Sequence, residues 1–202
     1  PPRNPRGNKG TFGKVLVVAG SRDMCGAAFF AAKASLLAGA GMVRIFTEEH
    51  NRMVLQQLLP EALLTTYRED EEEETLRRLL GQAVDWADVA AAGPGIGTGR
   101  AADRIVTALL ADSGKPLVLD ADGLNLLSRR KELLKQTSSA CILTPHMGEM
   151  SRLTGLPVSA LAEDPAGCLE AFCGDYPVTC ILKDARTVTK TAGGPVFLNT
   201  RG

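Results

Sequence analysis

Short apolar runs alternate along this chain with longer stretches that have helical spacing. Most side chains within the runs are apolar and they do not alternate regularly with polar ones, which is typical of strands covered on both faces of a parallel sheet. The runs span residues 14–19, 42–47, 87–92, 116–120, 140–144 and 178–183. This pattern predicts an α/β fold with a central, mostly parallel sheet that is flanked by helices on both faces.

Four stretches between the runs predict crossover helices. They span residues 27–38, 48–59, 71–80 and 100–111. After the last run, the segments 186–190 and 195–199 flank Gly193-Gly194, which is a hairpin signal. The acidic run at 68–74 is interpreted as the solvated start of a helix and is assigned no chemistry.

The composition is that of a soluble globular protein, and it predicts a single domain over residues 1–202. The 23 basic and 23 acidic residues cancel, so the overall charge does not favour nucleic acid or an anionic membrane. No stretch approaches the roughly 20 apolar residues that a membrane span needs. Five cysteines without C-x-x-C spacing predict reduced thiols in a cytoplasmic protein, with neither disulfides nor a zinc site.

Glycine- or acid-bearing segments follow four of the predicted strands. They span residues 20–28, 93–99, 119–125 and 144–149. In an open parallel sheet the carboxyl ends of the strands share one edge, and ligands bind there. We therefore expect these four segments to assemble one site.

The turn from Gly20 to Gly26 fits neither the G-x-G-x-x-G pattern nor the phosphate-binding G-x-x-x-x-G-K-S/T pattern. Two interpretations remain open. One is a plain turn from strand to helix. The other is close approach of a flat or phosphorylated ligand to the small Ala27 and Ala28 at the helix start.

The segment from Gly93 to Gly99 has four glycines in seven positions, more than an ordinary turn requires. It precedes a predicted helix, whose first backbone N–H groups lack partners within the helix. The segment therefore predicts an anion site, with Gly97 close to a ligand.

Asp120 and Asp122 leave a predicted strand two residues apart, so their side chains would point the same way if the chain stayed extended. One of them could then position magnesium-phosphate or a hydroxyl group, with Asn125 as a further donor and acceptor. The alternative is that Asp122 only caps the helix that follows.

His146 and Glu149 follow another predicted strand through a Thr-Pro exit, and Gly148 leaves space for a ligand. His146 is therefore predicted to be functional, whereas His50 is interpreted as solvated surface. Glu149 is either a capping acid or a site carboxylate. Lys183 ends the last predicted parallel strand, where a lysine can hold a phosphate.

Together, these motifs resemble the ADP/ATP-dependent NAD(P)H-hydrate dehydratases, a family with a ribokinase-like fold. The order and rough spacing of the motifs match from position 8 onward. The matching segments are Lys9-Gly-Thr-Phe-Gly13, Gly20-Ser21, Gly26-Ala-Ala28, Gly93-Pro-Gly-Ile-Gly97, Leu119-Asp-Ala-Asp122, Thr144-Pro-His-Met-Gly-Glu149 and Lys183-Asp-Ala followed by Thr187.

The resemblance implies a lyase that repairs the S epimer of hydrated NADH or NADPH with ATP or ADP and Mg²⁺. Transfer of a phosphoryl group to the ring hydroxyl would turn a poor leaving group into phosphate. The implied partners are the NAD(P)H hydrate, an adenine nucleotide, an NAD(P)H-hydrate epimerase domain or protein, and further copies of the chain in a homo-oligomer.

The resemblance also implies roles for particular residues, none of them as a metal ligand. Those implied for substrate binding are Ala27, Ala28, Gly97, Asn125, His146 and Glu149. Those implied for nucleotide binding are Lys183, Asp184, Ala185, Arg186 and Thr187. Four positions depart from the family pattern, namely Asn8, Gly123, Met147 and Asp184, and Asp184 weakens the expected nucleotide contact.

The family's general base is an aspartate in a Gly-Thr/Ser-Gly-Asp motif, which the resemblance puts beyond Gly202. We therefore expect the 202-residue chain to be incomplete at its carboxyl end and nearly inactive, because a positioned base contributes about 10²- to 10⁴-fold in rate. Two alternatives remain: a small-molecule kinase of this fold, for instance for a vitamin precursor, or a non-catalytic nucleotide-binding domain.

Overall fold

The computed structural model describes residues 5–137 and 140–200. The ends of the predicted domain, 1–4 and 201–202, lie outside these ranges. The strands are β1 (Lys14–Val18), β2 (Met42–Glu48), β3 (Leu63–Tyr67), β4 (Val89–Ala92), β5 (Leu117–Leu119), β6 (Cys141–Leu143), β7 (Thr179–Leu182), β8 (Thr187–Thr191) and β9 (Val196–Asn199).

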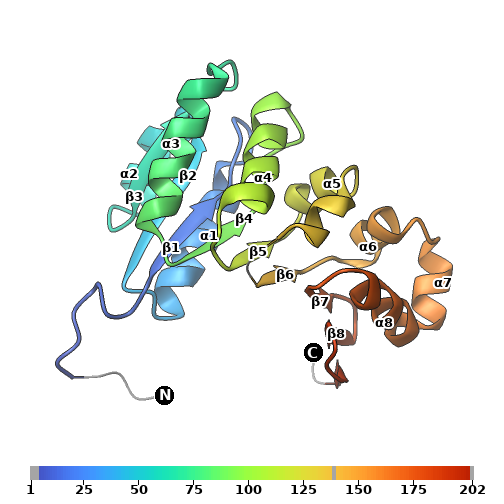
Figure 1. Ribbon diagram of the computed structural model, residues 1–202. Helices are drawn as coiled ribbons and strands as arrows, with labels where there is room; N and C mark the ends of the chain where they lie inside the picture. Colours follow the sequence, from blue (N-terminus) through green and yellow to red (C-terminus); the bar gives the residue numbers. More distant parts are fainter. Residues whose placement is uncertain (1–4, 138–139, 201–202) are drawn as a thin grey trace.

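All of these strands belong to one sheet in the order β3-β2-β1-β4-β5-β6-β7-β8-β9 (Figure 1). The neighbours from β3 to β7 are parallel, whereas β8 and β9 are antiparallel additions. The predicted parallel sheet, its six strands and the terminal hairpin are therefore confirmed.

The helices are α1 (Cys25–Leu37), α2 (Arg52–Leu58), α3 (Glu73–Trp86), α4 (Arg100–Asp112), α5 (Asp122–Leu127), α6 (Met147–Thr154), α7 (Val158–Glu163) and α8 (Pro165–Asp175). Two 3₁₀ turns add Glu49–Asn51 and Lys131–Lys135. Within the described ranges, no helix combines the length and apolar character that crossing a bilayer requires.

Some elements had no clear pattern in the sequence. β3 was not predicted; it lies at the sheet edge with Leu63 exposed, so no continuous apolar run marks it. α3 extends six residues beyond the predicted end, since Leu80, Ala83 and Val84 continue its buried face. The helices α6 to α8 were also not predicted: α6 and α7 are short, and α8 contains Gly167 and Gly174, which weaken its helical pattern.

Two separate hydrophobic cores lie on opposite faces of the sheet. The smaller core joins β1 and β2 to α1 and α2 through residues such as Val17, Ala28 and Leu55. The larger core contains residues of α3 to α8 and extends from Leu16 to Val188. The division follows from right-handed crossovers, which change face when the chain reverses direction along the sheet.

The expectation that all strands are covered on both faces is wrong for β4 to β7 within the described residues. Ala91, Val118 and Ile142 are paired neighbours in register, and they are only half-buried. Their sequence neighbours on the other face belong to the larger core. The helices that follow β4 to β6 lie on that face, because the chain progresses in one direction there.

Adjacent residues of β6 test this one-sided burial. Leu143 is fully buried, so we expect Leu143→Ala to lower the free energy of unfolding by about 3 kcal/mol. Ile142 is half-buried, and Ile142→Ala should cost about 1 kcal/mol, because it leaves no enclosed cavity. Urea unfolding of both variants measures the difference, and equal losses would contradict the arrangement.

Candidate active site

The turns after β1, β4, β5, β6 and β7 lie at one edge of the sheet, because these five strands are parallel neighbours. The direction of the crossovers reverses between β1 and β4, which is the usual position of a ligand site in an open α/β sheet. All of the predicted site residues lie in these turns or at the beginning of the helix or strand that follows.

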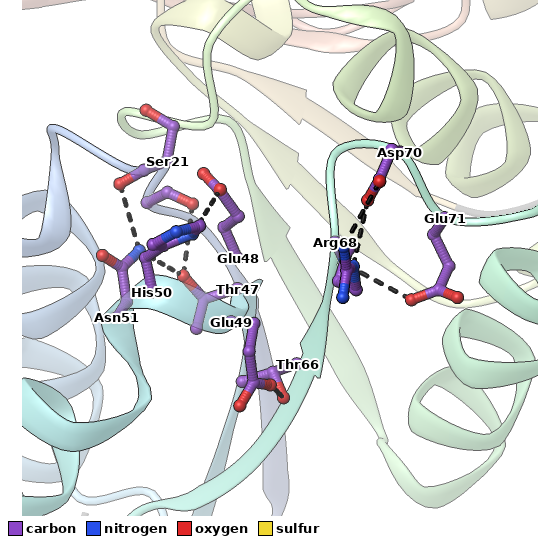
Figure 2. A network of polar contacts seen from close by, with 11 residues as sticks. Ser21, Thr47, Glu48, Glu49, His50, Asn51, Thr66, Arg68, Asp70 and Glu71 are labelled. Atoms are coloured by element: carbon purple, nitrogen blue, oxygen red, sulfur yellow. Dashed lines mark hydrogen bonds and ion pairs between the residues drawn. The ribbon is translucent and has the colours of Figure 1, made fainter.

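The turn after β1 is held against the end of β2. Gly20 has φ +80°, and a Cβ there would lie 2.9 Å from the Ala28 Cβ atom. Thr47 Oγ1 donates to the Gly20 carbonyl at 3.2 Å, and Asn51 Nδ2 donates to the Ser21 carbonyl at 3.1 Å (Figure 2). No local pattern marks Thr47 or Asn51, since these bonds join residues 27 and 30 positions apart.

The two alanines predicted to contact substrate differ in exposure. Ala28 is fully buried in the smaller core, so its side chain packs beneath Gly20. Ala27 is partly exposed and faces Gly95, where a Cβ would lie 2.8 Å from its own. A ligand at this edge can touch the side chain of Ala27 but not that of Ala28.

The glycine-rich segment after β4 packs closely against the turn after β5. Gly93, Gly95 and Gly97 all have positive φ. A Cβ on Gly93 would lie 1.9 Å from the carbonyl oxygen of Asp120. Backbone packing therefore requires glycine at position 93, independently of any ligand.

Two amides, one in this segment and one in the first turn of α4, are already satisfied by carboxylates of the chain. The Gly97 amide donates to Asp122 Oδ2 at 3.0 Å, and the Ala101 amide donates to Glu69 Oε1 at 3.3 Å. The prediction of unpaired N–H groups is wrong for these two, because acids from neighbouring turns reach the helix start and offset its dipole. A phosphate bound here would have to displace a carboxylate.

Asp120 and Asp122 do not form a pair, because the chain leaves the extended conformation between them. Ala121 has φ 52° and ψ −123°, the one positive φ of a non-glycine residue in the described ranges. Asp120 turns toward Lys183, whereas Asp122 turns toward Gly97. The alternative that Asp122 caps α5 also fails, since the helix begins at Asp122 and its N-cap is Ala121.

Asn125 connects two charged side chains behind the turn. Its Nδ2 donates to Asp122 Oδ1 at 3.4 Å, and its Oδ1 accepts from Arg152 Nε at 2.7 Å. Both ends of the amide are therefore engaged within the chain. The contact with substrate predicted for Asn125 would require exchange of one of these bonds.

His146 and Glu149 form a reciprocal cap at the beginning of α6. His146 Nδ1 accepts from the amides of Gly148 and Glu149 at 2.9 and 3.4 Å, and Glu149 Oε2 accepts from the His146 amide at 2.8 Å. Because Nδ1 accepts, the neutral imidazole carries its proton on Nε2. Glu149 is buried and orients His146, so the capping interpretation of Glu149 is confirmed.

Lys183 connects the predicted substrate and nucleotide residues. Its amide donates to the Pro145 carbonyl at 2.8 Å, and its backbone pairs with His146 in a parallel bridge. Its Nζ reaches Asp120 Oδ1 at 2.7 Å, although the two residues are 63 positions apart. The following Asp184, Ala185 and Arg186 are exposed and Thr187 begins β8.

The backbone at Ala121 gives a prediction for stability. A residue with a side chain in such a conformation costs about 1–3 kcal/mol, so we expect Ala121→Gly to raise the free energy of unfolding by about 1 kcal/mol after the entropy of glycine is deducted. Ala108→Gly, within α4, is the control and should lower it by about 1 kcal/mol. If both variants lost the same amount of unfolding free energy, as measured by urea unfolding, position 121 would be unstrained.

The cap at α6 separates two roles of His146. We expect His146→Ala to lower the free energy of unfolding by about 1 kcal/mol, because the amides of Gly148 and Glu149 lose their acceptor. Asparagine caps helices well, so His146→Asn should keep the stability while it removes the imidazole from the exposed edge. A stable His146→Asn variant that binds the substrate as the wild type does would exclude a role of the ring in binding.

Comparison with solved structures identifies the class of protein. A ribokinase-like superfamily protein from Enterococcus faecalis V583 matches with a TM-score of 0.85 and 28% identity, over 100% of this chain and 67% of that chain. An ADP/ATP-dependent NAD(P)H-hydrate dehydratase from Bacillus subtilis, co-crystallized with ATP/Mg²⁺, matches with a TM-score of 0.80 and 29% identity, over 100% and 69%. The fold is therefore ribokinase-like.

The family is equally clear. A family model for NAD(P)H-hydrate dehydratase matches residues 15–202, and the chain belongs to that family. A bifunctional NAD(P)H-hydrate repair enzyme from Thermofilum pendens is 34% identical over 100% of this chain and 39% of its own length. An ADP-dependent (S)-NAD(P)H-hydrate dehydratase from Lactiplantibacillus plantarum is 35% identical over 75% and 52%. The chain thus spans only part of these relatives.

Proposed function

We propose that this chain binds the S epimer of hydrated NADH or NADPH and an adenine nucleotide for ATP- or ADP-dependent dehydration. The observation that carries the proposal is the position of Lys183. It pairs with His146 through the backbone and reaches Asp120 with its amine, so the residues implied for the two ligands are adjacent. Phosphoryl transfer requires this proximity of donor and acceptor.

The proposed chemistry has two stages. The terminal phosphoryl group of the nucleotide moves to the ring hydroxyl oxygen, whose proton passes to a general base, and the shortened nucleotide leaves. The lone pair of the ring nitrogen then expels phosphate from the neighbouring carbon. Loss of a proton from the next ring carbon forms the C=C bond and restores the dihydronicotinamide. The roles proposed for this chain are substrate contact by Ala27, Gly97 and His146, and contact with nucleotide phosphates by Lys183.

Magnesium would supply charge neutralisation on the transferred phosphoryl group. No group of three or more histidine, cysteine or acidic residues is placed to hold a metal ion in residues 5–137 and 140–200. Asp120 and Asp122 lie at the edge, but Lys183 and Gly97 already occupy them. The donor set therefore fits an ion that enters with the nucleotide, mostly coordinated by phosphate oxygens and water.

The proposal extends to the setting of the reaction. We propose that the protein is cytoplasmic, that it forms a homo-oligomer, and that it acts together with an NAD(P)H-hydrate epimerase domain or protein. The proposed partnership with an epimerase is supported by relatives named bifunctional NAD(P)H-hydrate repair enzymes. This chain matches 39% of the length of the one from Thermofilum pendens.

The test follows NADH absorbance after (S)-NADH hydrate, ATP and Mg²⁺ are mixed with the protein. It compares the 202-residue chain with the same chain joined to a carboxyl-terminal segment of the Bacillus subtilis dehydratase that carries the Gly-Thr/Ser-Gly-Asp motif implied by the resemblance. We expect the joined protein to restore NADH about 10²- to 10⁴-fold faster, because the resemblance assigns the general base to that motif. Replacement of the added motif's aspartate by asparagine is the control.

Two outcomes would contradict the proposal. A stable phosphorylated small molecule without recovery of NADH would favour the kinase alternative. Nucleotide binding without turnover by the joined protein would favour a non-catalytic domain. A hydroxyethylthiazole kinase, a phosphomethylpyrimidine kinase and a pyridoxal kinase match with 14–20% identity and support only the fold.

A further inference from the structure

A surface cavity of about 510 Å³ opens at the carboxyl edge beside the proposed substrate residues. Its volume is that of a typical small-ligand site. Three segments contribute to it: the turn after β1, the end of β2 and the turn after β3. The lining residues are Arg22, Glu48, Glu49, His50, Arg68, Glu69 and Asp70.

Glu48 and His50, which both line this cavity, are joined by a hydrogen bond (Figure 2). The Glu48 side chain is 10% exposed, and its Oε1 lies 2.9 Å from His50 Nδ1. A carboxylate accepts hydrogen bonds, so His50 Nδ1 donates to Glu48. The His50 side chain is 55% exposed, as its interpretation as solvated surface predicts, and a buried acid fixes the orientation of its ring.

Of the two guanidinium groups in the lining, that of Arg68 is paired within the chain. Arg68 Nε donates to Asp70 Oδ1 at 3.0 Å. Outside the lining, Arg52 donates to Glu49, and hydrogen bonds from Arg52 and Thr66 lower the pKa of Glu49 to about 2. The four carboxylates and two guanidinium groups of the lining sum to a formal charge of −2, with histidine left out of the sum.

The negative field reaches the neighbouring phenol. Tyr67 ends β3 between the two acidic segments and is buried. Burial raises the pKa of Tyr67, and the charges of Glu69 and Glu48 raise it further. The cavity is therefore rich in acceptors and unfavourable for an additional anion.

The position of Glu48 in the sheet topology indicates which ligand group its carboxylate accepts a hydrogen bond from. In dinucleotide-binding sheets ordered 3-2-1-4, an acid at the end of the second strand, about 20 residues beyond the glycine turn, accepts a hydrogen bond from the ribose 2′-hydroxyl. This sheet has the order β3-β2-β1-β4. Glu48 ends β2, 22 positions after Gly26 (48 − 26).

We propose that this cavity binds the adenosine ribose of the coenzyme through its 2′- and 3′-hydroxyls and disfavours a 2′-phosphate. This inference rests on the proposed function, and it makes NADH hydrate the preferred substrate over NADPH hydrate. Hydroxyl groups donate to Glu48, Glu69 or Asp70, whereas a phosphate dianion would face the same carboxylates without a free partner for each charge.

The test uses NAD⁺ and NADP⁺ as probes, since they differ only in the 2′-phosphate. Titration calorimetry on the 202-residue chain should give a dissociation constant for NADP⁺ at least about tenfold above that for NAD⁺. Asp70→Lys removes one carboxylate and frees Arg68, and the side chain is 75% exposed, so folding should persist. We expect it to reduce the ratio of dissociation constants about fivefold or more.

Asp85→Lys is the matched control, because it makes the same charge change at an exposed position near the far end of α3. It should leave the ratio unchanged. Equal affinities for the two probes, or an unchanged ratio in Asp70→Lys, would overturn the proposal. So would tighter binding of NADP⁺ that Arg22→Ala abolishes, since Arg22 would then hold the phosphate.

The repair assay distinguishes this inference from the proposed function. Repair of both hydrates by the joined protein with equal kcat/KM would contradict this inference but not the proposed function. If neither probe bound and no repair occurred, both the inference and the proposed function would be contradicted. Repair of NADH hydrate with kcat/KM about tenfold higher than for NADPH hydrate would support both.

Discussion

The close contact between the turns after β4 and β5 is the constraint on which the candidate site depends. Gly93 packs so tightly on the Asp120 carbonyl that a Cβ would lie 1.9 Å from the oxygen. This contact brings Gly97 to Asp122 and leaves Asp120 free to meet Lys183. Backbone packing therefore positions the residues that we propose for substrate and nucleotide binding, before any ligand enters.

The chain uses its own acids to complete this edge. Asp122 and Glu69 satisfy amides at the beginning of α4, and Glu149 completes the cap on α6. Each acid stabilises a helix start, where the partial charge of the backbone is positive. A phosphate ligand must exchange with these groups, so recognition at this edge is a competition between internal and external anions.

The sequence was sufficient for the larger features of the fold. Continuous apolar runs predicted the six parallel strands, and Gly193-Gly194 predicted the hairpin. The turns that form the candidate site were also marked, by glycines, acids and a histidine at the ends of the predicted strands. The family resemblance added the separation into substrate and nucleotide residues.

Contacts between distant residues could not be predicted in this way. Asp120 meets Lys183 across 63 positions, and Thr47 and Asn51 hold the turn after β1. The prediction that the side chains of Asp120 and Asp122 point the same way was wrong because of one residue, Ala121, whose positive φ depends on tertiary packing. Short-range patterns carry no information on such a contact or on which face of β4 to β7 is covered.

The separation of the two cores has a consequence for the order of folding. The smaller core uses β1, β2, α1 and α2, and its members extend from Val15 only to Leu64. The larger core is complete only with Val188. Contacts that are local in sequence form with a lower entropy cost. The amino-terminal quarter of the sheet can therefore consolidate during synthesis, before the strands that precede His146 and Lys183 leave the ribosome.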